Sequence, residues 1–205
     1  MAHTLIIGFG NPDRADDGVA WHVANAVRAR LGQPPLSDDD IGEDSAPHVA
    51  VGAIHELPLP NHASDRGVGA VHELPLPNAT PRPQADVIFL FQLAPELMET
   101  LAAYDRVIFV DAHVRADVPT LHVTPIEPDL TSSAFTHHLT PGQLLAWTQA
   151  VLGRAPAGYL VSVRGWDFDF HRQLSPQTAA QVGPAAQQVL ALLAEDSPTT
   201  DERGG

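Results

Sequence analysis

The sequence of 205 residues contains no cysteine and no lysine. The absence of cysteine excludes a disulfide framework, a thiol nucleophile and a thiolate metal site. Because all 11 basic residues are arginines, the chain has neither a phosphate-binding P-loop lysine nor a Schiff-base lysine. The 25 acidic residues bring the formal net charge to −14, and a surface of that charge repels nucleic acid and anionic membranes.

Long apolar runs are also lacking. The first one, Leu5 to Ile7, is three residues long and has no basic flank, so it does not resemble a signal peptide. No apolar stretch reaches the 18 or so residues that a membrane-spanning helix needs. We therefore expect a cytoplasmic protein with no membrane partner.

Short apolar runs alternate with amphipathic patterns along the chain, which predicts an α/β fold. We expect a three-layer sandwich in which a mostly parallel, twisted sheet is covered by helices on both faces. The expected strands cover residues 4–7, 87–91, 106–110, 120–124 and 159–163. The expected helices cover residues 19–31, 95–104, 140–152 and 175–194. Asp16 or Asp17 is expected to cap the first helix, and a break is expected in the last helix near Gly183-Pro184.

A single domain over residues 1–195, followed by a polar tail at 196–205, accounts for this pattern. Residues 33–84 differ from the rest because they are rich in proline and contain a tandem repeat, in which residues 51–61 recur as 68–78. Two copies are too few for a solenoid, and we read the segment as a duplicated surface insertion. Its His-Glu pairs do not form a zinc-protease helix, because a proline follows two residues after each glutamate.

The turn after the first strand, Gly8-Phe9-Gly10, looks like the start of a dinucleotide-binding loop. The third glycine of that motif would fall at position 13, which is an aspartate. Asp16 and Asp17 follow, and carboxylates at this place oppose a bound pyrophosphate. A nucleotide-binding protein is therefore a weak alternative.

Three side chains follow the carboxyl ends of predicted strands, where sites form in such sheets. They are Asp17, Asp111 and His137, with the adjacent His138 as the fallback. Two carboxylates and an imidazole suit divalent nickel or zinc and leave a coordination position open. From the residues alone, a second interpretation stays open in which Asp17 and His137 cap helices and Asp111 satisfies a turn.

Several separated motifs resemble those of the nickel–iron hydrogenase maturation endopeptidases. In chain order they are Gly8-Phe-Gly-Asn11, Asp16-Asp17-Gly18, Gln92-Leu-Ala-Pro-Glu96-Leu, Val107-Ile-Phe-Val-Asp111-Ala and Thr136-His137-His138-Leu139. A further segment, Arg164-Gly165 with Phe168, Phe170 and Leu174-Ser175, resembles the variant that serves bidirectional, NAD-linked hydrogenases. The chain departs from the family in the long insertion at 33–84 and in Ala20, where a second glycine is common.

The resemblance implies an endopeptidase that removes the C-terminal extension of a hydrogenase large-subunit precursor once nickel is inserted. It places the metal ligands on Asp17, Asp111 and His137, which would also be the catalytic residues. The nickel would be carried by the substrate, and other divalent metals could occupy the same ligands. A protein that checks nickel loading in the same subunit without cutting it is the alternative, because it would use the same three ligands.

Overall fold

The computed structural model describes residues 3–41, 85–130 and 139–195. The predicted repeat at 51–78, the tail at 196–205 and both candidate histidines, His137 and His138, lie outside these residues.

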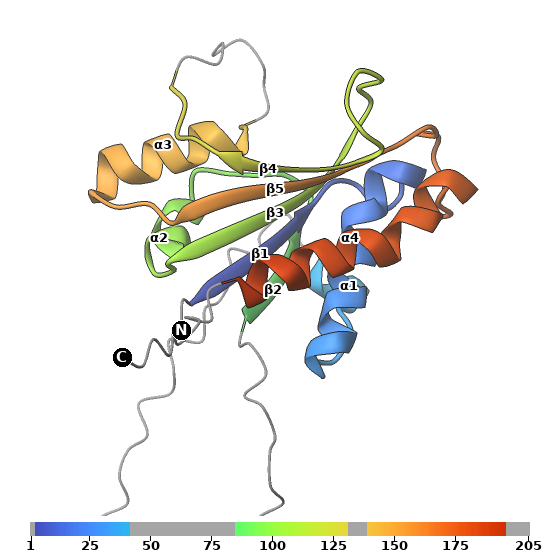
Figure 1. The fold of residues 1–205 in the computed structure, drawn as a ribbon, viewed down its shortest axis with the longest axis horizontal. Coiled ribbons are helices and arrows are strands. Elements are labelled where there is room, and N and C mark those ends of the chain that lie inside the picture. The colour runs from blue at the N-terminus through green and yellow to red at the C-terminus, as the bar shows by residue number, and fades with distance from the viewer. Residues whose placement is uncertain (1–2, 42–84, 131–138, 196–205) are drawn as a thin grey trace, which may run out of the picture.

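A five-stranded sheet with the order β2-β1-β3-β5-β4 runs through the centre of the molecule (Figure 1). Its strands are β1 (Thr4–Phe9), β2 (Ala85–Leu90), β3 (Arg106–His113), β4 (Leu121–Ile126) and β5 (Ala157–Arg164). The first three and β5 are parallel, and β4 pairs with β5 in the antiparallel sense at the sheet edge. The carboxyl ends of β1, β3 and β5 therefore meet at one rim of the sheet.

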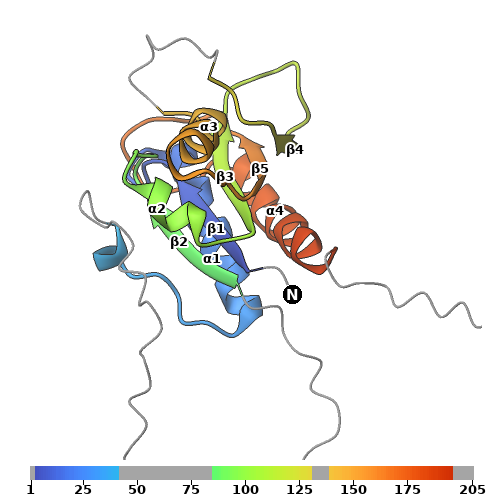
Figure 2. The ribbon, with the colours of Figure 1, turned by 90° about the vertical axis from the view of Figure 1, so that its left-hand side faces the viewer.

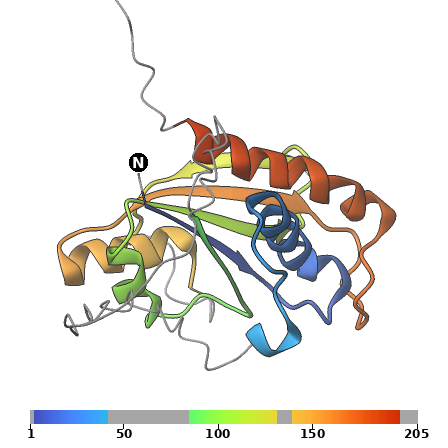
Figure 3. The same cartoon turned by 90° about the horizontal axis from the view of Figure 1, so that it is seen from below.

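Helices cover both faces of this sheet (Figures 2 and 3). Alternate residues of the central strands point to opposite faces, as the period of a strand requires. Ile6 and Ile108 pack with α1 (Val19–Leu31) and α4 (Pro176–Ala194), whereas Leu5, Ile7 and Phe109 pack with α2 (Leu97–Ala102) and α3 (Pro141–Leu152). All five of these side chains are at most 1% exposed. The predicted three-layer α/β sandwich is confirmed.

The helix boundaries follow the expected local signals in most places. Thr140 and Gln143 form a capping box at the start of α3, and the Ser175 hydroxyl accepts a hydrogen bond from the Thr178 amide at the start of α4. Gly32 ends α1 in a left-handed conformation with φ of 73°. The helix predicted at 95–104 is shorter, because the residues before Leu97 form turns.

Two local predictions are wrong. Neither Asp16 nor Asp17 caps α1: a 3-10 turn, η1 (Ala15–Gly18), precedes it, and Gly18 is the N-cap without a side-chain bond. Helix α4 continues through Pro184 instead of breaking there. The buried residues that follow Pro184, such as Ala186 and Val189, pack against the core, and this packing sustains the helix. None of the helices in the described residues is long and apolar enough to cross a membrane.

Candidate functional site

The loop after β1 is packed so tightly that two of its glycines leave no room for a side chain. Gly10 has φ of 134°, and a Cβ there would lie 2.3 Å from the Asp17 carbonyl oxygen. A Cβ on Gly18 would lie 2.7 Å from the Pro12 Cα. The glycines of the motif at residues 8–18 therefore allow the loop to fold back against η1.

This fold-back fixes the Asp17 side chain at the sheet rim. The Asn11 amide donates a hydrogen bond to Asp17 Oδ2 at 3.0 Å, and the Asn11 side chain in turn accepts one from the Asp13 amide at 2.9 Å. Asp17 is partly exposed. Its second carboxylate oxygen has no hydrogen-bond partner among the described residues.

Asp111 lies near the carboxyl end of β3, which extends three residues further than the sequence predicted, to His113. Burial raises the pKa of the Asp111 carboxyl to about 7, and the charge of Asp17 adds to this. A hydrogen bond from the Ala112 amide to Asp111 Oδ1, at 2.7 Å, opposes the rise. The two carboxylates are therefore close enough to interact, and a bound cation would relieve their repulsion.

Two histidines that the sequence analysis did not single out lie in the same part of the sheet. His113 is on β3, the strand of Asp111, and His122 is on β4. The sheet register aligns Asp111 on β3 with Ser162 on β5, and Ser162 with His122 on β4. His113 follows two residues after Asp111, and both of its ring nitrogens are buried without a hydrogen-bond partner among the described residues. Burial lowers the pKa of His113, and nearby His122 lowers it further. His113 is thus a neutral imidazole at neutral pH.

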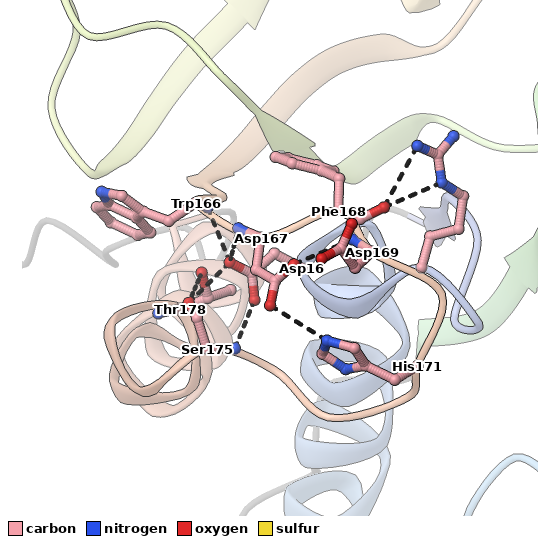
Figure 4. A network of polar contacts seen from close by, with 9 residues as sticks. Asp16, Trp166, Asp167, Phe168, Asp169, His171, Ser175 and Thr178 are labelled. Carbon is pink, nitrogen blue, oxygen red and sulfur yellow. Dashed lines mark hydrogen bonds and ion pairs between the residues drawn. The ribbon is translucent and has the colours of Figure 1, made fainter.

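Asp16, predicted only as a possible helix cap, is fully buried and lies at the centre of a polar network (Figure 4). Its carboxylate accepts hydrogen bonds from the Trp166 and Asp167 amides and from Ser175. These partners are distant in sequence, so no local pattern could reveal the network.

Of the predicted ligands, the structure brings Asp17 and Asp111 together, whereas His137 and His138 lie outside the described residues. Within residues 3–41, 85–130 and 139–195, no group of three or more histidine, aspartate or glutamate side chains could hold a metal ion. The carboxylate pair therefore supplies two oxygen donors, and the third ligand remains a prediction.

Solved structures of similar shape match nearly the whole chain. The hydrogenase maturating endopeptidase HybD from E. coli has a TM-score of 0.61 and 20% identity, covering 95% of this chain and 94% of that one. An endopeptidase from E. coli solved in solution has a TM-score of 0.59 and 20% identity over the same shares. The [NiFe] hydrogenase maturation protease HybD from Thermococcus kodakarensis has a TM-score of 0.54 and 15% identity, covering 93% of this chain and 99% of that one.

The chain has the fold of the hydrogenase maturation endopeptidases. No protein-family model matches the sequence, and no curated protein matches it significantly. At these identities the likeness establishes the fold, while the assignment of activity rests on the residues. In this fold, the motifs that carry Asp17 and Asp111 lie at the ends of the adjacent parallel strands β1 and β3.

Proposed function

We propose that the chain is a nickel-dependent endopeptidase that removes the C-terminal extension of a nickel–iron hydrogenase large-subunit precursor after nickel insertion. The observation that carries the proposal is the interacting pair Asp17 and Asp111 at the carboxyl rim of the sheet. The fold shared with maturation endopeptidases supports it, as do the sequence motifs that surround both aspartates.

The proposed role of the pair is to recognise the metal that the substrate carries. Asp17, Asp111 and His137 would bind the substrate's nickel, so that only a loaded precursor is positioned for cleavage. Among the described residues, one Asp17 carboxylate oxygen has no hydrogen-bond partner, and ionisation of Asp111 beside it is unfavourable without a cation. Both features favour a divalent cation, and other divalent metals could bind the same ligands.

The same residues would then assist hydrolysis. A cation held by Asp17, Asp111 and His137 would polarise the scissile carbonyl. A water attacks the carbonyl carbon and gives a proton to one of the two carboxylates, after which the C–N bond breaks and the leaving amine takes up a proton.

The direct test uses Asp17→Asn and Asp111→Asn with a nickel-loaded precursor, followed by mass spectrometry of the large subunit. We expect wild type to reduce the mass of the large subunit, and each variant to lose at least about 100-fold in rate. Asp13→Asn is the matched control, because Asp13 is exposed in the same loop and pairs with Arg172 on the surface. Full cleavage by both site variants would refute the assignment.

The same experiment separates the two candidate activities. Binding of the nickel-loaded precursor without a change in its mass would favour a non-cleaving checkpoint protein over a protease. The proposal places the reaction in the cytoplasm, in keeping with a cysteine-free chain.

A further inference from the structure

We infer that Asp16 is a positioning residue that holds Asp17 in place, by fixing η1 to the chain segment between β5 and α4. We call residues 166–175 the return segment. The inference rests on the proposed function for its catalytic meaning, whereas its structural part can be tested independently.

The Asp16 carboxylate connects two parts of the return segment to η1. Asp16 Oδ2 accepts hydrogen bonds from the Trp166 amide at 2.8 Å and the Asp167 amide at 3.0 Å. Ser175 donates from its amide to Oδ1 and from its hydroxyl to Oδ2, both at 2.7 Å. Figure 4 shows these donors converging on one carboxylate. Burial alone would raise the pKa of Asp16, but the hydrogen bonds outweigh it and hold the pKa below its ordinary value.

Two backbone hydrogen bonds reinforce this connection. In these, η1 donates and the return segment accepts. The Asp16 amide donates to the Asp167 carbonyl at 3.0 Å, and the Ala15 amide donates to the His171 carbonyl at 2.6 Å. The position of η1, which carries Asp17, therefore depends on the return segment as well as on the loop after β1.

Gly165, directly before the return segment, packs closely against Asp16. A Cβ on Gly165 would lie 3.0 Å from the Asp16 Cβ and 2.6 Å from the ring of Phe168. This contact accounts for the Arg164-Gly165 motif with Phe168 that the sequence shows. Gly165 leaves room for Asp16, which is the neighbour in sequence of the candidate metal ligand Asp17.

The backbone of η1 depends on these contacts. Ala15 has φ of 44°, the one positive value among the described non-glycine residues. An alanine held in this region is strained, and such strain persists only where the surroundings determine the conformation. Loss of the Asp16 hydrogen bonds would let the turn relax. Asp17, the next residue, would then move away from the Asn11 amide, which donates a hydrogen bond to its carboxylate.

A role in stability alone is the competing explanation, because Asp16→Asn would face backbone N–H groups with an amide NH₂ and so destabilise the fold. Hydrogen exchange at the Asn11 amide distinguishes the two roles. We expect Asp16→Asn to lower protection of the Asn11 amide about tenfold more than protection of amides in β1. On a nickel-loaded precursor we expect kcat to fall about 10- to 100-fold with KM little changed, as for other residues that orient a ligand.

Two further variants complete the experiment. Leu101→Ala opens a cavity in the core beside α2, so it should reduce stability while leaving the kcat of the folded protein and the relative protection of Asn11 unchanged. Ser175→Ala removes the hydroxyl that donates to Asp16 and also caps α4. It should lower Asn11 protection in the same direction as Asp16→Asn but less, and it serves if the Asp16 variant does not fold.

Unchanged Asn11 protection in both the Asp16 and Ser175 variants would overturn the inference, as would equal local effects in Leu101→Ala. If wild type fails to cleave any precursor, the proposed function fails, while the exchange measurement still decides the role of Asp16.

Discussion

Asp111 lies beside Asp17 at the carboxyl rim of the sheet, where burial and the neighbouring charge raise the pKa of Asp111 to about 7. Near neutral pH the Asp111 carboxyl can therefore carry a proton. A divalent cation that binds both carboxylates must displace that proton. The ionisation of Asp111 thus links cation binding to pH.

Cation affinity should accordingly fall as the pH is lowered from 8 to 6, because protonated Asp111 does not ligate. His137 must also be neutral to act as a ligand, so its protonation below about pH 6.5 should lower the cation affinity further. Isothermal titration with Cd²⁺ in buffers of different ionisation enthalpy would show proton release on binding near pH 7. An affinity that is constant between pH 6 and 8 would contradict this expectation.

Asp111→Asn should stabilise the folded protein at pH 8 in the absence of metal. The folded-state pKa is raised above the ordinary value of 3.8, so wild type loses stability as the pH rises from about 4 towards 7 and beyond. We expect the variant to gain about 1–3 kcal/mol in free energy of unfolding at pH 8 and little below pH 4, where Asp111 is protonated in both states. Urea unfolding at several pH values measures this. A gain that does not depend on pH would mean that the buried charge is not its cause.

Gly10→Ala should disrupt the site more than an ordinary glycine substitution. The new methyl group would meet the Asp17 carbonyl oxygen at 2.3 Å, on a backbone with φ of 134°. We expect a loss of at least about 2–3 kcal/mol, through strain and steric overlap, together with loss of cleavage. Gly153→Ala is the control, because Gly153 also has positive φ but nothing lies within 4 Å of the added Cβ. Its cost should be about 1 kcal/mol from the backbone alone, and equal costs at the two positions would contradict the steric explanation.

The sequence predicted the layers of the fold well, because apolar runs such as Val107–Val110 report burial on both faces of a parallel sheet. It also predicted that Asp17 and Asp111 lie close together, because both follow the ends of parallel strands. It did not predict the network around Asp16 or the alignment of His122 with Ser162. Both depend on which distant segments pack together, and residue spacing carries no such information.

The continuity of α4 illustrates a second limit. Pro184 lacks the amide that would donate to the preceding turn, so the local rule predicted a break, whereas tertiary packing of the buried face preserves the helix. Pro184→Ala should therefore raise the free energy of unfolding, by about 1–2 kcal/mol, because it restores a hydrogen bond within an existing helix.

Gly183→Ala tests the same point without restoring an amide. The added Cβ meets nothing within 4 Å, and a helical alanine is favoured over glycine by about 1 kcal/mol. Thermal unfolding of both variants measures the gains. A loss of stability in each would show that a bend at Gly183-Pro184 is needed for packing.

A crystal structure of the protein soaked with Cd²⁺ or Ni²⁺ tests the proposed metal site most directly. We predict one ion bound by carboxylate oxygens of both Asp17 and Asp111, with His137 or His138 completing the ligands. An ion that leaves either aspartate uncoordinated, or that binds elsewhere with the rim empty, would contradict the proposal.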